Sequence, residues 1–141
     1  MRLIFLGLAM LLAPAPAMAQ QWYRVAGDEI SQTFVDLDSI KPEGDRTMAT
    51  EMVLYRTHFR DTEVKHMVTH SEFDCPARRA HFLRVEFFGD DRGELGAVDD
   101  PDEGGYRSVR PGSPAESTLN FVCGVDRDGA VAVADPWADP S

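Results

Sequence analysis

FDCPARRAHFLRVEFF (residues 73–88) decides how this chain folds. A short polar interruption at Pro76 separates two runs whose polar and apolar residues alternate, which is the pattern of a β-hairpin. In the second run, this alternation would place His81, Leu83, Val85 and Phe87 on one face, and Ala80, Phe82, Arg84 and Glu86 on the other. The first run ends near Cys75, so the sequence predicts two antiparallel strands with a sulfur at their turn.

More strands are expected around this hairpin. Short runs with high β propensity alternate with turns rich in Gly, Pro and Asp, so strands that are neighbours in sequence should pair antiparallel. The expected strands are residues 22–26, 30–35, 47–59, 63–74 and 79–88, and residues 130–134 can add an edge strand. These runs predict an antiparallel meander.

A single convincing helix signal lies in SPAESTLNFVCG (residues 113–124). Ser113 suits the N-cap, Pro114 suits the first helical position, and Glu116 completes a capping box. Gly124 is a typical residue to end the helix. One face of the helix would carry Leu119, Val122 and Cys123. The predicted fold class is therefore α+β, with one C-terminal helix packed on an antiparallel sheet.

Residues 1–19 have the features of a secretory signal peptide. Arg2 supplies the positive start, an apolar run follows, and Ala17-Met18-Ala19 resembles a cleavage site. The apolar run is shorter than the ~20 residues needed to span a bilayer, although an uncleaved anchor is the alternative. No cysteine lies near the cut, so lipid attachment is not expected. The chain is therefore predicted to be exported.

The chain has only two cysteines, Cys75 and Cys123. Outside the cytosol two thiols tend to be oxidised, so one disulfide joining the predicted helix to the sheet is the simplest interpretation. A reactive cysteine is a second possibility. A metal site is a third, but it would need more ligands than this pair supplies.

The chain carries 24 acidic and 14 basic residues, for a net charge of −10. This charge argues against nucleic acid and anionic membranes as general partners. Much of the acidity lies in the acidic loop, residues 90–103, within a Gly-bounded segment expected to be a loop or a frayed hairpin. Such a loop can bind calcium loosely, but a solvated loop is the simpler interpretation.

No catalytic or cofactor motif is evident. His66 and His70 would lie about 13 Å apart along a strand, too far to share one zinc ion. The Asp126–Gly129 segment begins like a calcium loop but lacks the later ligands, and Ser113 has no nucleophile-elbow glycines around it. We therefore expect no enzyme activity, no cofactor and no metal.

Three arginines on the central hairpin, Arg78, Arg79 and Arg84, form a candidate ligand-binding strip, which Arg107 and Arg110 could extend. Arginine beside large apolar side chains is typical of interfaces, and the strip would attract an anionic partner. The alternative is that the apolar residues form the core and the arginines only keep the edge soluble.

Four segments resemble the surface-adhesin protein E family of Gram-negative bacteria. They are WYRV (residues 22–25), FVDLDSI (34–40), FDCPARRAHFL (73–83) and VRPGSPAESTLNFVC (109–123). The resemblance implies a sheet of about six strands with a C-terminal helix, and a disulfide between Cys75 and Cys123. It also implies binding to host extracellular-matrix or plasma proteins.

The predicted organisation is a signal peptide (1–19), one α+β domain (20–124) and an acidic, Pro-rich tail (125–141) that is largely disordered. The predicted function is non-enzymatic binding in the periplasm or on the outer surface. The alternatives are a periplasmic structural or envelope-stress protein without a host ligand, and a small enzyme.

Overall fold

The computed structural model describes residues 20–138; the predicted signal peptide lies outside them. The strands are β1 (Trp22–Gly27), β2 (Ser31–Asp36), β3 (Lys41–Glu43), β4 (Arg46–Tyr55), β5 (His66–Asp74), β6 (Arg79–Phe88), β7 (Glu94–Asp99), β8 (Arg107–Ser108) and β9 (Val131–Val133). The helices are the 3₁₀ turns η1 (Leu37–Ser39) and η2 (Pro136–Ala138) and one α-helix, α1 (Pro114–Val122).

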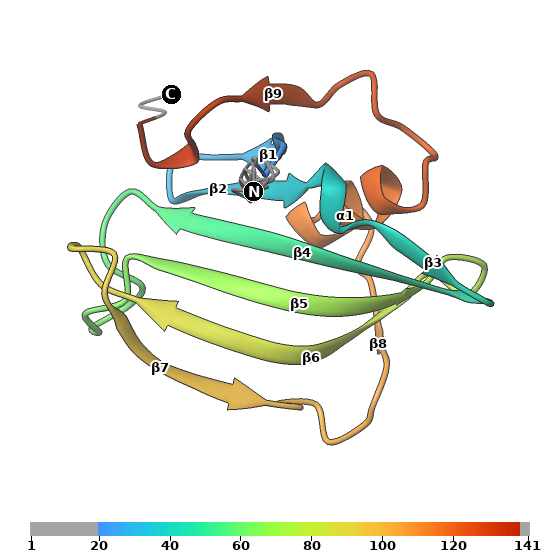
Figure 1. The fold of residues 1–141 in the computed structure, drawn as a ribbon, viewed down its shortest axis with the longest axis horizontal. Helices are drawn as coiled ribbons and strands as arrows, with labels where there is room; N and C mark the ends of the chain where they lie inside the picture. Colours follow the sequence, from blue (N-terminus) through green and yellow to red (C-terminus); the bar gives the residue numbers. More distant parts are fainter. Residues whose placement is uncertain (1–19, 139–141) are drawn as a thin grey trace, which may run out of the picture.

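The strands of the described chain form one antiparallel, twisted sheet (Figure 1). Its order is β7-β6-β5-β4-β2-β1-β9, with β3 also paired to β4 and β8 to β6. The predicted α+β class is confirmed, but the expected count of about six strands is too low, since the sheet has nine. The extra strands include the very short β3 and β8, and the acidic β7 inside the segment expected to be a loop or a frayed hairpin. Apolar alternation is too weak there to reveal them.

A β-bulge corrects the predicted faces of β6. Phe82 is opposite Ser71 and Arg84 is opposite His70, so Leu83 is the extra, unpaired residue. An extra residue reverses the alternation beyond it. Phe82 therefore shares a face with Val85, and the predicted grouping of Val85 with His81 is wrong. The sequence carries no Gly or Pro at this point to signal the bulge.

The main core lies between α1 and one face of the sheet, where the helix packs on β1, β2 and β4 (Figure 1). Ser113 caps the helix by accepting a hydrogen bond from the Glu116 N–H, while Glu116 accepts one from Gly112 N–H at 2.7 Å. The capping box thus forms as predicted, except that Glu116 accepts from the N–H of Gly112 and not from that of Ser113. The buried cluster consists of Val35, Ala49, Phe73, Ala80, Leu119, Phe121 and Val122.

A second buried group lies on the opposite face of the sheet. His66 is stacked on Phe88 with ring centroids 4.4 Å apart, and Trp137 of η2 meets the same imidazole at 3.8 Å. Strand β9 pairs with β1 and leads the chain to this point. Strand β9 lies where an edge strand was expected in the tail, and η2 follows it within residues that were expected to be disordered; residues 139–141 lie outside the described part.

Within residues 20–138, no helix is long and apolar enough to cross a membrane.

Candidate functional site

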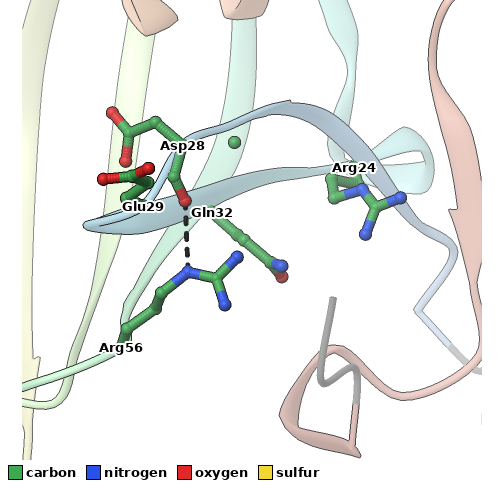
Figure 2. Close-up of a pocket in the computed structure, with 6 residues that line it drawn as sticks. Arg24, Asp28, Glu29, Gln32 and Arg56 are labelled. Atoms are coloured by element: carbon green, nitrogen blue, oxygen red, sulfur yellow. Dashed lines mark hydrogen bonds between the residues drawn. The ribbon is translucent and has the colours of Figure 1, made fainter.

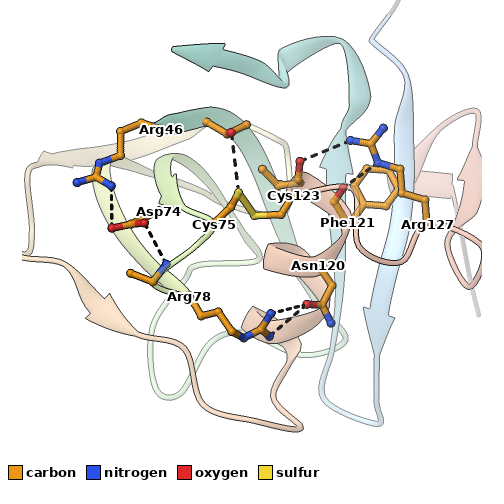
Figure 3. Close-up of a disulfide and its surroundings, with 11 residues drawn as sticks. Arg46, Asp74, Cys75, Arg78, Asn120, Phe121, Cys123 and Arg127 are labelled. Carbon is orange, nitrogen blue, oxygen red and sulfur yellow. Dashed lines mark hydrogen bonds and ion pairs between the residues drawn. A yellow bond between two sulfur atoms is a disulfide. The ribbon is translucent and has the colours of Figure 1, made fainter. Parts of the chain in front are cut away.

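The Cys75–Cys123 disulfide joins the turn after β5 to the C-cap of α1 (Figure 3). The Cα atoms are 5.7 Å apart, and the bridge closes a separation of 48 residues. The two sulfurs are thus bonded to each other, as the exported setting predicted. A free thiol nucleophile and a thiolate metal ligand are both excluded by this bond.

Arg78 braces the same junction (Figure 3). Its backbone φ of 53° lies in the left-handed region and completes the turn between β5 and β6. Its guanidinium donates to Glu116 at 2.9 Å and to Asn120 at 3.2 Å, both on α1. The side chain therefore lies on the helix side and links the hairpin to the helix.

Arg79 and Arg84 lie on the other face of the sheet. Arg79 pairs with Asp74 at 2.7 Å, and Arg84 pairs with Glu86 at 2.9 Å and with Asp99 at 2.6 Å. The arginines proposed as one strip are thus divided between two faces, and each has an acidic partner. Their role in ligand binding stays a prediction.

Charged side chains cover this open face near the start of β6. Asp74 also pairs with Arg46 at 2.7 Å, and the ring of Tyr106 lies beneath both guanidinium groups, 4.9 Å from that of Arg46 and 5.2 Å from that of Arg79. The hydrogen bond from Arg79 is the main reason that the pKa of Asp74 is lowered. This Tyr106 cluster presents a rigid aromatic and charged surface to solvent.

The acidic loop is tied to the sheet by basic partners. Asp99 pairs with Arg84, Asp100 accepts from His81 at 2.8 Å, and Asp102 pairs with Arg107. The pKa of Asp100 is lowered, first by His81 and then by the Gly104 N–H. No group of three metal-ligating side chains occurs in the part of the chain that the structure describes, and His66 and His70 do not form one.

An open hollow of about 780 Å³ lies at the β1–β2 turn. Figure 2 shows the residues that line it. Asp28 accepts hydrogen bonds from the N–H groups of Ile30 and Ser31, which lower its pKa. Its carbonyl accepts from Arg56 Nε at 3.1 Å. The hydrogen bonds of Asp28 and Arg56 thus lie within the turn, and the buried Oε1 of Gln32 has no hydrogen-bond partner among the described residues. The hollow is open to solvent and would enclose little of a ligand.

A smaller pocket of about 320 Å³, the Glu51 pocket, lies on the helix side of the sheet. Burial raises the pKa of the Glu51 carboxyl to about 7, an effect only partly offset by the neighbouring Thr118. Its walls consist of Phe73, Ala80, Phe82, Arg107, Ser108, Val109, Arg110, Ser113, Ala115 and Thr118. Sequence reasoning did not select Glu51, although its alternation with Ala49 and Val53 was a usable signal.

The family model for surface-adhesin protein E matches residues 22–124. Among solved structures, crystal form II of Haemophilus influenzae protein E has a similar fold, with a TM-score of 0.55 and 12% sequence identity. The match covers 82% of this chain and 97% of that one. No curated protein sequence is significantly similar to the chain.

Proposed function

This chain belongs to the surface-adhesin protein E family, and from that premise we propose that it is an exported, non-enzymatic binding domain of a Gram-negative bacterium. The family match over residues 22–124 is the observation that carries the proposal, because it spans the strands β1–β8, the helix and both cysteines. The proposed partner is a host extracellular-matrix or plasma protein.

The Cys75–Cys123 bridge supports export, because disulfides persist mainly outside the cytosol. Each arginine of the candidate strip forms an ion pair with an acidic side chain, which would hold its guanidinium in place for a contact; these residues are Arg78, Arg79 and Arg84. These observations support a binding function and do not point to a catalysed reaction.

The proposed contact surface is the β5–β6 hairpin with its neighbour β7. Beyond the turn that the disulfide joins to α1, these strands make little contact with the helix, and their side chains are only partly covered (Figure 1). Val85 and Phe87 are half-buried, and Val98 of β7 is 46% exposed. Exposed apolar area is typical of protein-binding surfaces. Arg79 and Arg84 lie on the opposite face of these strands, so they would form a separate, charged part of the contact.

The first experiment is retention of matrix and plasma proteins by the immobilised mature protein, together with antibody labelling of intact cells. Specific retention and surface labelling are the expected results. Labelling only after the outer membrane is opened, with envelope proteins retained instead, would favour a periplasmic role without a host ligand.

The contact surface is tested by two variants that address its two components. Arg78, Arg79 and Arg84 are changed together to Ser, and Val98 is changed separately to Asp. We expect each variant to fold and to lose most of the retention, and the arginine variant to show less salt dependence, because exposed charges are screened beyond ~8 Å. Full retention by both folded variants would place the contact elsewhere.

A further inference from the structure

The Glu51 pocket is enclosed by three parts of the chain that are distant in sequence. Strands β4, β5 and β6 form its floor, the segment 107–110 forms one wall, and the N-terminal part of α1 forms the other. Its volume of about 320 Å³ falls in the range of small-molecule sites, roughly 300–1,000 Å³. The Phe73 and Phe82 rings give it an apolar interior.

The carboxyl of Glu51 has no cationic partner. It lies on the core-facing side of β4, opposite Val35 of β2 and Thr69 of β5. None of the described basic side chains forms an ion pair with it, and no cation lowers its pKa. A carboxylate removed from water without such a partner is unfavourable, so the group most complementary to it is a cation.

Thr118 is a second, independent observation that points to a ligand in the pocket. The residue lines the pocket and is 1% exposed, and its buried Oγ1 has no hydrogen-bond partner in residues 20–138. The Thr118 side chain lies close enough to Glu51 to lower the pKa of its carboxyl, but the geometry between the two side chains falls short of a hydrogen bond. A buried, unpaired hydroxyl costs roughly 1–3 kcal/mol. An N–H donor in the pocket could satisfy both oxygens.

The mouth of the pocket has the opposite charge. Arg107 is paired with Asp102, but Arg110 is exposed and has no ion pair with any described side chain. A free guanidinium at the mouth opposes a simple cation. It favours a ligand whose outer end is a carboxylate, which arginine binds through two parallel hydrogen bonds.

We propose that the Glu51 pocket binds a small, zwitterionic, amino acid-like ligand. Its cationic nitrogen contacts Glu51 and Thr118, its apolar chain lies against the phenylalanine rings, and its carboxylate reaches Arg110. This site faces the helix side and goes beyond the proposed adhesive function, which uses the outer half of the sheet.

The test is calorimetric titration of the mature protein with three matched probes: 6-aminohexanoate, hexylamine and hexanoate. We expect 6-aminohexanoate to bind at least about tenfold more tightly than either single-charge probe, a difference of ~1.4 kcal/mol. Binding should tighten between pH 6 and pH 8, because Glu51 is the one lining side chain that titrates near neutral pH. Equal binding of hexanoate, or no saturable binding by the folded protein at ~10 mM, would overturn the proposal.

Variants separate the two ends of the ligand. Glu51→Gln keeps the shape but should weaken 6-aminohexanoate and hexylamine about tenfold and abolish the pH dependence. Arg110→Gln should weaken 6-aminohexanoate and leave hexylamine unchanged. Arg56→Gln, at a residue that lines the hollow of Figure 2 and not the Glu51 pocket, is the control that should change neither. Unchanged binding in folded Glu51→Gln contradicts the proposal, as does a Glu51 pKa, followed by NMR, that does not fall when ligand is added.

Discussion

At the scale of single residues, two titratable side chains lie on opposite faces of the sheet, Glu51 partly buried and His66 buried. Burial raises the pKa of Glu51 to about 7, and burial together with the nearby Arg92 lowers the pKa of His66 to about 4. Each group therefore favours its neutral form in the folded protein. Between pH 4.5 and 6.5 their effects on stability have opposite signs, so each needs its own variant.

Glu51→Gln is expected to stabilise the protein above neutral pH. The folded protein holds the Glu51 proton more tightly than the unfolded chain does, with a pKa of about 7 against 4.5. The free energy of unfolding therefore falls as the pH rises through this window. The variant should gain roughly 2 kcal/mol at pH 8 and little at pH 4, by urea denaturation. If the free energies of unfolding of the variant and the parent change in parallel with pH, the pKa of Glu51 in the folded protein is close to its ordinary value of 4.5.

His66 has the opposite effect. The unfolded chain takes up its proton near pH 6.5, whereas the folded protein resists until about pH 4. The free energy of unfolding should therefore fall as the pH falls from 6.5 to 4, by roughly 2 kcal/mol in the Glu51→Gln background. His66→Phe, which keeps an aromatic ring beside Phe88, should remove this loss. An NMR titration that gives His66 a pKa near 6.5 in the folded protein would refute the explanation.

At the scale of elements, the junction between the β5–β6 turn and α1 is held twice. The Cys75–Cys123 bridge joins the turn to the end of the helix, and Arg78 binds Glu116 and Asn120 nearby. The exposed ion pair contributes at most about 1 kcal/mol, so the covalent link is the stronger constraint. The short α1 depends on this junction, because a nine-residue helix is marginal alone.

Cys75→Ser and Cys123→Ser should each lower the free energy of unfolding by up to about 4 kcal/mol, the chain-entropy value for a loop closed over 48 residues. The double variant should cost nearly the same as either single variant, because one bridge is lost in every case. Denaturation curves of the three variants measure this. Additive losses, or alkylation of the parent without reductant, would argue against a single bridge.

At the scale of the whole molecule, segments remote in sequence complete the sheet's surfaces. The acidic loop folds back as β7 and places three aspartates against Arg84, His81 and Arg107. The C-terminal end carries Trp137 across to the imidazole at the start of β5. The net charge of −10 is therefore partly neutralised in local pairs, and Trp137 helps to exclude water from His66.

Trp137→Ala should destabilise the protein by about 2 kcal/mol, less than a fully buried tryptophan would, because the side chain is half-buried. Water would then reach the imidazole, so the pKa of His66 should rise from about 4 towards 6.5. NMR titration and thermal unfolding measure the two effects. Val131→Ala, at an exposed position in β9, is the control, and an unchanged His66 pKa in Trp137→Ala would contradict this packing.

The sequence alone determined the features that depend on local chemistry. Alternation predicted the long strands, the cap residues Ser113 and Glu116 predicted α1, and two cysteines after a predicted signal peptide predicted their bridge. Four short motifs in order were enough to indicate the family later matched by its model. These signals work because each depends on residues within a few positions, or on a single possible pair.

Only the tertiary structure decided which side chains meet. The bulge at Leu83 reversed the faces of β6, and the ion pairs divided Arg78 from Arg79 and Arg84. Glu51 became the centre of a pocket because α1 and the segment 107–110 enclose it, although neither is near it in sequence. Register and long-range packing depend on the whole sheet, so a pattern of neighbours along the chain cannot specify them.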